Sequence, residues 1–250
     1  MYGYKKFNNL RWLFKSLDKY LINESKLTVV TSAGFGHFLY NKNWPNNLIV
    51  QANKLNAIFL EEDRPIIQKL TMDKLVFAYV GAFRYPNTIF RFAKIIGKNY
   101  PQHEFHFYGE STLTRLAIKL SNEYLNVKHY GVFKNPNDLP SIYKNINVVV
   151  AAYDIQSLNE RIAEPNKLYE ALYFQKPIII SKNTFLADRV NDFGCGFAID
   201  ASNDESIISF IDTLDIQKLK EIESNISKIS LDEIIDDNSE KIINHISNKF

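Results

Sequence analysis

The stretch EPNKLYEALYFQKPIIIS, residues 164–181, places an amphipathic segment directly before a short apolar run. Apolar side chains recur at helical spacing over 164–174, and the run at 176–181 has the length and the branched side chains of a strand. Apolar strands that are separated by helices indicate a parallel sheet covered on both faces. The stretch therefore predicts an α/β fold.

The same alternation of strand and helix begins at Lys74 and continues on both sides of this stretch. The predicted strands are short and apolar: 75–80, 104–108, 126–130, 146–153, 176–181 and 196–200. The predicted helices lie between them: 88–99, 111–123, 137–144, 164–174 and 184–191. We therefore expect a Rossmann-like parallel sheet flanked by helices over residues 71–230, followed by a closing helix at 231–250.

Residues 1–70 show a different pattern. A helical pattern at 5–22 carries one apolar stripe, with basic residues mostly off it; the stripe consists of Leu10, Leu13, Phe14, Leu17 and Leu21. Strand patterns at 27–32 and 48–55 flank a small helix at 33–40. This is too little to close a second sheet, so we interpret 1–70 as the remnant of an N-terminal domain with its linker. The basic helix can pack on its own protein or lie on an anionic membrane, and both interpretations stay open.

Composition excludes several classes of protein. The net charge of the 250 residues is only +2, which does not indicate a nucleic-acid partner. The single cysteine, Cys195, excludes an internal disulfide and a cysteine-based zinc cluster. No apolar run approaches the roughly 20 residues of a membrane-spanning helix, and no signal-peptide pattern opens the chain. We expect a cytoplasmic protein.

Two charged residues near the start of the predicted helix at 164–174 point to phosphate chemistry. Lys167 lies in the first turn, where a cation opposes the helix dipole unless an anion binds there. Glu170 follows three residues later and has oxygens that accept hydrogen bonds from a ribose diol. The spacing alone fits a nucleotide-diphosphate site and an exposed ion pair equally well.

The segment resembles the donor-site motif of GT-B glycosyltransferases of the family 4 type. In that family a small-residue–Lys-x-x-Glu helix precedes a GkPvi strand, and this chain reads NKLYE at 166–170 and QKPII at 175–179. Further pieces follow in the family's order: FAYVGAF (77–83), HFYGE (106–110), VKHYGVF (127–133), LPSIYKNINVVVAAY (139–153) and VNDFGCGFAID (190–200). Residues 7–40 and LIVQAN (48–53) resemble the end of the family's acceptor-side domain.

The resemblance implies an enzyme that transfers a sugar, with retention of configuration, from a nucleotide sugar to a cell-surface polysaccharide or a lipid-linked glycan. It implies a UDP-linked donor, no cofactor and no metal, and Arg84 and Lys167 as the catalytic cations that face the diphosphate. Glu170 is the expected ribose ligand. The predicted donor-binding set is completed by residues in the strand-end turns and at the helix start: Gly81, Phe83, Gly109, Gly131, Val132 and Asn166.

Two departures from the family pattern leave alternatives open. The family motif is Glu-x(7)-Glu, but the residue eight positions before Glu170 is Ile162, and neither Glu160 nor Glu164 has the required spacing. Arg84 follows Gly81 by three residues, whereas the family's arginine follows its glycine directly. A nucleotide-sugar epimerase of the same fold and a non-catalytic nucleotide-binding or partner module remain alternatives. The missing acceptor side would come from an N-terminal domain or a partner subunit, and the protein would work at the inner face of the cell membrane.

Overall fold

The computed structural model describes residues 10–60, 64–65, 71–236 and 239–247. Its main feature is a six-stranded, all-parallel sheet in the order β5-β4-β3-β6-β7-β8. The strands are β3 (Val76–Val80), β4 (Glu104–Tyr108), β5 (Val127–His129), β6 (Val148–Ala151), β7 (Ile178–Ser181) and β8 (Gly196–Ile199). This confirms the predicted Rossmann-like fold.

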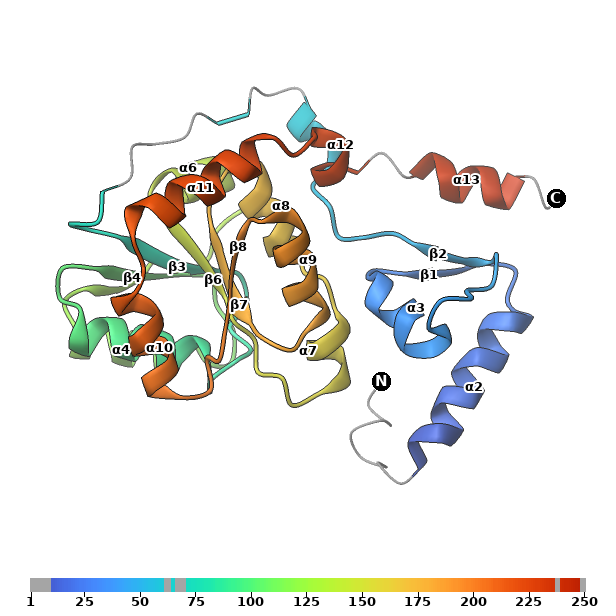
Figure 1. Ribbon diagram of the computed structural model, residues 1–250, viewed down its shortest axis with the longest axis horizontal. Helices are drawn as coiled ribbons and strands as arrows, with labels where there is room; N and C mark the ends of the chain where they lie inside the picture. The colour runs from blue at the N-terminus through green and yellow to red at the C-terminus, as the bar shows by residue number, and fades with distance from the viewer. Residues whose placement is uncertain (1–9, 61–63, 66–70, 237–238, 248–250) are drawn as a thin grey trace.

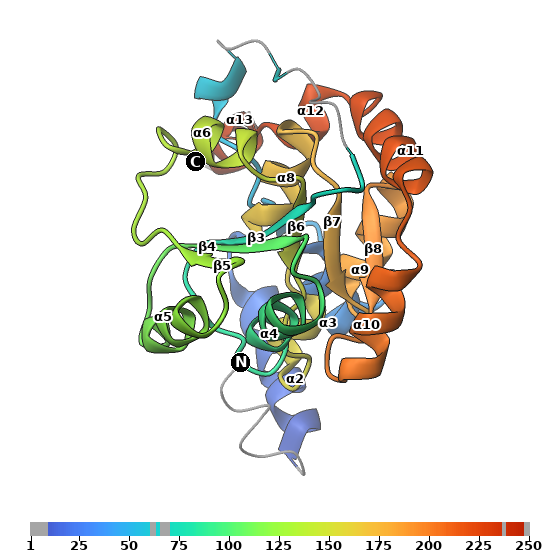
Figure 2. The same ribbon diagram turned by 90° about the vertical axis from the view of Figure 1, so that its left-hand side faces the viewer.

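Helices cover both faces of the sheet, as Figure 2 shows for its β5-β4-β3 half, with α4 and α5 on one side and α6 and α8 on the other. Each helix predicted between the strands forms: α4 (Ile89–Asn99), α5 (Thr114–Glu123), α6 (Leu139–Lys144), α8 (Asn166–Tyr173) and α9 (Phe185–Phe193). One short helix, α7 (Leu158–Ile162), was not predicted. Four helices follow β8: α10 (Asp204–Asp212), α11 (Ile216–Ser227), α12 (Leu231–Ile234) and α13 (Ser239–Ser247). The single closing helix predicted at 231–250 is therefore wrong, because the chain is extended at Ile235, after α12.

The core lies between the sheet and its helices. Strands β6 and β7 are buried along their whole length, as is expected of central parallel strands, and this is why their sequences read as continuous apolar runs. Side-chain caps start several helices: Thr184 accepts from the Ala187 N–H at α9, and Asp215 accepts from the Lys218 N–H at α11. Gly194 ends α9 in the left-handed conformation.

Before the sheet, residues 10–50 form a small unit, which we call the N-terminal unit. It contains α2 (Arg11–Glu24), β1 (Thr28–Val30), α3 (Ala33–Tyr40) and β2 (Leu48–Val50), followed by a 3₁₀ turn, η2 (Ala57–Leu60). The strands form a separate two-stranded parallel sheet. Figure 1 shows this unit beside the main domain, with α2 at its outer side. Residues 5–9 of the predicted first helix lie outside the described residues.

Hydrogen bonds and close packing join the N-terminal unit, and Asn53 just after it, to the main domain. The Ser32 hydroxyl at the start of α3 donates a 2.6 Å hydrogen bond to the carbonyl of Ile162. Gly34 sits against the same carbonyl, because a Cβ at Gly34 would lie 2.3 Å from the Ile162 oxygen. Asn53 donates a 3.0 Å bond to the Glu164 carbonyl. The unit therefore contacts the segment that leads into α8.

Arg64 connects the linker to the main domain. Its guanidinium donates to backbone carbonyls near the C-terminal ends of α8 and α11: those of Leu172, Tyr173, Ile226, Ser227 and Ile229. A cation is favourable at these positions because helix C-termini carry partial negative charge. In the part of the chain that the structure describes, no helix is both long enough and apolar enough to cross a membrane.

Candidate functional site

A cavity of about 410 Å³ lies at the carboxyl ends of β3 and β6, between the N-terminal unit and α8. This is the edge at which parallel α/β sheets bind ligands. Five of the predicted site residues line it: Gly81, Arg84, Asn166, Lys167 and Glu170. Residues from two separate strand ends and one helix start therefore share one cavity, together with Thr31, Phe35 and Asn53 of the N-terminal side.

Lys167 crosses the cavity toward the turn after β3. Its Nζ lies 4.8 Å from the centroid of the Tyr79 ring, and a Cβ at Gly81 would lie only 2.8 Å from the same nitrogen. Gly81 also has a φ of +125°, a backbone conformation that favours glycine at this position. Burial lowers the pKa of Lys167, and the positive charge of Arg84 lowers it further, against the opposing effect of Glu170.

The start of α8 is favourable for an anion. Pro165 occupies the N-cap position, where no side chain caps the helix, and the first turn holds Lys167 and no acidic residue. Arg84 is exposed at the same cavity. Among the described residues, no hydrogen bond or ion pair involves the charged end of either Arg84 or Lys167. Two cations that form no ion pair among the described residues therefore meet at a helix N-terminus, with Glu170 one turn away.

Glu170 lies one turn further along α8 and is buried. The Tyr143 hydroxyl donates to its carboxylate at 2.7 Å. Burial raises the pKa of Glu170, while Lys167 and the bond from Tyr143 act in the opposite direction. Glu170 also lines an adjoining cavity of about 390 Å³, together with Lys54, Asn56 and Asn135. The carboxylate thus lies where the two cavities meet.

The remaining predicted residues do not line this cavity. The Phe83 side chain is 2% exposed and packs in the hydrophobic core, with its ring centroid 5.4 Å from that of Phe107. Gly109 and Gly131 adjoin at the same end of the sheet, where the Gly109 N–H donates to the Gly131 carbonyl at 2.7 Å, and Val132 is 73% exposed. The role of Gly109, Gly131 and Val132 in donor binding stays a prediction, and Phe83 lies outside the cavity, with its carbonyl accepting a hydrogen bond from Ser111.

Two acidic residues that the sequence analysis rejected on their spacing, Glu160 and Glu164, line the cavity. Glu164 is 4% exposed, and its carboxylate accepts from the hydroxyl of Tyr169 and, at 3.5 Å, from Nε of Arg189. Glu160 forms a capping box with Ser157 at the start of α7. The Ser-x-x-Glu spacing predicts the start of that helix, whereas no sequence signal indicated that Glu164 lines the same cavity as Lys167.

Aromatic rings form another part of the lining that was not predicted. Tyr85 and Tyr153 stack with their centroids 4.1 Å apart and their planes inclined by 22°. Both line the cavity beside Arg84. Stacked rings of this kind present a flat apolar surface next to a cationic site.

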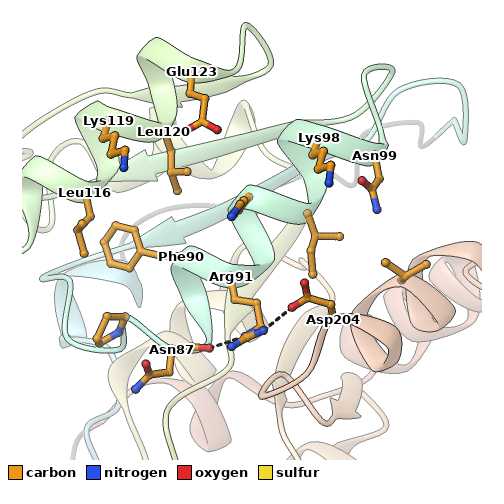
Figure 3. Close-up of a pocket in the computed structure, with 14 residues that line it drawn as sticks. Asn87, Phe90, Arg91, Lys98, Asn99, Leu116, Lys119, Leu120, Glu123 and Asp204 are labelled. Atoms are coloured by element: carbon orange, nitrogen blue, oxygen red, sulfur yellow. Dashed lines mark hydrogen bonds and ion pairs between the residues drawn. The ribbon is translucent and has the colours of Figure 1, made fainter.

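A separate groove of about 530 Å³ lies between α4, α5 and α10 (Figure 3). Arg91 closes one end by pairing with Asp204 and by donating a 3.0 Å bond to the Asn87 carbonyl. Lys98 and Lys119 lie along its rim. None of the predicted site residues lines this groove. This groove has a larger volume than the cavity at the end of the sheet, but the cationic and acidic residues described above line the cavity.

Comparison with known proteins identifies both the fold and the family. TarM of S. aureus, solved with fondaparinux, alpha-GlcNAc-glycerol and UDP, has 16% identity and a TM-score of 0.61, over 92% of this chain and 46% of that chain. Anabaena HepE, solved with UDP and glucose, has 15% identity and a TM-score of 0.64, over 93% of this chain and 67% of that chain. Sucrose-phosphate synthase from Thermosynechococcus elongatus has 17% identity and a TM-score of 0.61, over 86% and 56%.

This chain thus spans about half the length of TarM. No curated protein matches it. The family model described as "Glycosyl transferases group 1" matches residues 61–228, which include the whole six-stranded sheet and the helix that carries Lys167 and Glu170. The chain belongs to the group 1 glycosyltransferases.

Proposed function

We propose that this chain forms the donor-binding part of a retaining glycosyltransferase that takes a sugar from a UDP-sugar. The acceptor in this proposal is a growing cell-surface polysaccharide or a lipid-linked glycan. The observation that carries it is the meeting of Arg84 and Lys167, neither of which forms an ion pair among the described residues, at the uncapped start of α8. The division into an acceptor-side remnant at 1–70 and a donor domain at 71–230 is part of the same proposal.

The diphosphate is the part of the donor that best suits these groups. Its negative charge balances Lys167 and Arg84, and its oxygens accept from the free N–H groups of the first turn of α8. Negative charge grows on the diphosphate as the bond to the sugar breaks. Groups that are already in place to stabilise that charge lower the barrier to transfer, which gives both cations a catalytic role.

Glu170 suits the ribose. Its carboxylate is held by Tyr143 at the junction of the two cavities, one turn from Lys167. A charged carboxylate accepts two hydrogen bonds from a vicinal diol more strongly than a neutral amide does. The base then lies toward the turns at Gly109 and Gly131. We propose uridine because HepE was solved with UDP and with UDP-glucose, and TarM with UDP.

Glu164 suits the sugar of the donor. Its carboxylate lies in the same cavity as Lys167, and the contacts with Tyr169 and Arg189 hold it in place. A carboxylate in this position is able to accept hydrogen bonds from sugar hydroxyls. The family motif has a glutamate at the position of Ile162 in this chain. We propose that Glu164 performs the role of that glutamate.

Ligand binding and turnover together test the proposed function. Calorimetry with UDP, GDP, dTDP and CDP is expected to show the tightest binding for UDP, and hydrolysis or transfer is expected with a UDP-sugar. Failure to bind any of these nucleotides would overturn the donor site. Binding of UDP without any turnover of UDP-sugars would favour the non-catalytic module. Interconversion of the sugar on its nucleotide would favour the epimerase.

A further inference from the structure

The apolar stripe of α2 faces solvent. Four leucines along it are 42–56% exposed, and two aromatic side chains beside it are 61–67% exposed; the six residues are Leu10, Leu13, Leu17, Leu21, Trp12 and Tyr20. We call these six residues the α2 face. Soluble monomers seldom leave a continuous apolar surface of this kind in water, so the α2 face indicates an interaction site.

The basic residues of α2 point the other way, toward α3. Arg11 and Lys15 lie over the Phe38 ring, 5.2 and 4.9 Å from its centroid, and Lys19 lies 5.2 Å from the centroid of Tyr40. Burial lowers the pKa of Lys15, and the charges of Lys19 and Arg11 lower it further. A helix that binds anionic lipid turns its cations toward the headgroups. Here the cations cover the protein, and the α2 face is uncharged.

The N-terminal unit lacks a full hydrophobic core of its own. Its buried core consists of Ile22, Leu39 and Leu48. Its sheet has two parallel strands, although parallel sheets are normally larger and covered on both faces. Val29 of β1 is also exposed. Additional apolar surface from a protein partner would therefore stabilise this unit.

Residue spacing and surface area indicate what this partner is. Leu10, Leu13, Leu17 and Tyr20 follow the alternating three- and four-residue steps by which one helix packs along another. Six half-exposed side chains of roughly 200 Å² each present roughly 600 Å², about three quarters of the ~800 Å² that each partner gives a stable interface. Two identical uncharged faces meet without like-charge repulsion, and twofold dimers are the commonest protein assemblies.

We propose that the α2 face binds the α2 face of a second copy of this chain, in a twofold dimer. Leu17 lies at the middle of α2 (Arg11–Glu24), so the two Leu17 side chains lie close to each other whether the helices run parallel or antiparallel. The proposal does not depend on the donor site, and its experiments use no nucleotide.

Disulfide crosslinking tests the geometry. Cys195 is the only cysteine and is fully buried, so Leu17→Cys adds the one accessible thiol. Mild oxidation is expected to convert most of the Leu17→Cys protein into a covalent dimer at micromolar concentration. Ile118→Cys, at an exposed apolar position on α5, is the matched control and is expected to stay monomeric. Equal crosslinking of the two variants would overturn the proposal.

Sedimentation velocity tests the proposal without any crosslink. The wild-type chain is expected to change from monomer to dimer with rising concentration, and Leu13→Glu/Leu17→Glu is expected to stay monomeric at concentrations at least tenfold higher. Ile118→Glu/Leu125→Glu makes the same chemical change on a distant surface and is expected to dimerise as the wild type does. Circular dichroism checks that each variant is folded.

Three results would count against the dimer. The first is a wild-type chain that is monomeric at all concentrations. The second is a dimer that survives Leu13→Glu/Leu17→Glu, because it would use another surface. The third is a wild-type monomer that floats with phosphatidylglycerol vesicles and loses that binding in the double variant, because this would assign the α2 face to a membrane.

Discussion

The Tyr143 hydroxyl donates a 2.7 Å hydrogen bond to the Glu170 carboxylate, and both side chains are buried below the proposed donor site. The bond joins α6 to α8. Burial favours the neutral form of Glu170, whereas the bond from Tyr143 and the charge of Lys167 favour the carboxylate. The charge of the proposed ribose ligand therefore depends on a tyrosine outside the donor cavity.

Replacing Tyr143 with phenylalanine is expected to raise the pKa of Glu170 further, because the hydrogen bond that stabilises the carboxylate is lost. UDP affinity is then expected to decline at a higher pH in Tyr143→Phe than in the wild type as the solution is acidified. Calorimetric titrations with UDP from pH 5 to pH 8 measure this. Parallel pH profiles in the two proteins would show that the bond has no effect on the site.

Lys167→Ala is expected to weaken UDP binding by roughly 1.5–3 kcal/mol, about tenfold to more than a hundredfold, because a charge-assisted contact to phosphate is lost. Uridine, which has no phosphate, is expected to bind the variant and the wild type equally. Lys94→Ala, on the rim of the separate groove between α4 and α5, is the matched control and should leave UDP affinity unchanged. Unchanged UDP affinity in Lys167→Ala would remove the diphosphate assignment.

Glu170→Gln is expected to weaken uridine and UDP by similar factors. The amide keeps the shape and one acceptor but loses the charge that strengthens bonds to the ribose diol. The two ligands therefore distinguish this variant from Lys167→Ala, which affects only UDP. Calorimetry with both ligands gives the comparison, and a loss confined to UDP would contradict the ribose assignment.

Much of the fold was predictable because buried parallel strands are rich in apolar residues, which can be recognised in the sequence. The runs at 104–108 and 176–181 are rich in aromatic and branched apolar residues, and they became β4 and β7 within two residues of the predicted limits. Helix α7 was missed because five residues give too little periodicity, although its Ser157 and Glu160 carry a capping signal. The packing direction of α2 also could not be predicted, because an amphipathic pattern does not indicate which face meets the protein.

The site was predictable where its residues lie close together in the chain. Lys167 and Glu170 are one turn apart on one helix, so their proximity followed from spacing. Phe83 turned into the core because its ring packs against Phe107, a residue from the neighbouring strand. Glu164 was set aside on spacing, and its place in the cavity depends on contacts with Tyr169 and Arg189 that only the folded chain brings together.

Arg64→Ala is expected to lower the free energy of unfolding by about 2–3 kcal/mol. The substitution leaves five carbonyl groups at the ends of α8 and α11 without their charged donor. This corresponds to a fall in Tm of several degrees. Arg115→Ala, at an exposed position on α5, is the control and should be nearly neutral. Equal melting temperatures for the two variants would contradict a stabilising role for Arg64.

Glu223 is expected to make stability depend on pH. Burial raises its pKa from 4.5 to about 7, against the opposing charges of Lys176 and Lys220. Between these values the folded state binds more protons than the unfolded state, so the free energy of unfolding falls as the pH rises toward 7. Glu223→Gln is expected to show a smaller loss of Tm than the wild type between pH 5 and pH 8. Identical pH profiles in thermal melts would contradict this.

Gly34 of α3 packs directly against the Ile162 carbonyl of α7, beside the proposed donor cavity. A methyl group at Gly34 would overlap the Ile162 carbonyl oxygen. Because that oxygen belongs to the backbone and cannot rotate aside, α3 and α7 would have to move apart. The N-terminal side of the cavity, including Thr31, Phe35 and Asn53, would then tilt away from Lys167. We therefore expect the missing Cβ of Gly34, a residue that does not line the donor cavity itself, to influence the width of its opening.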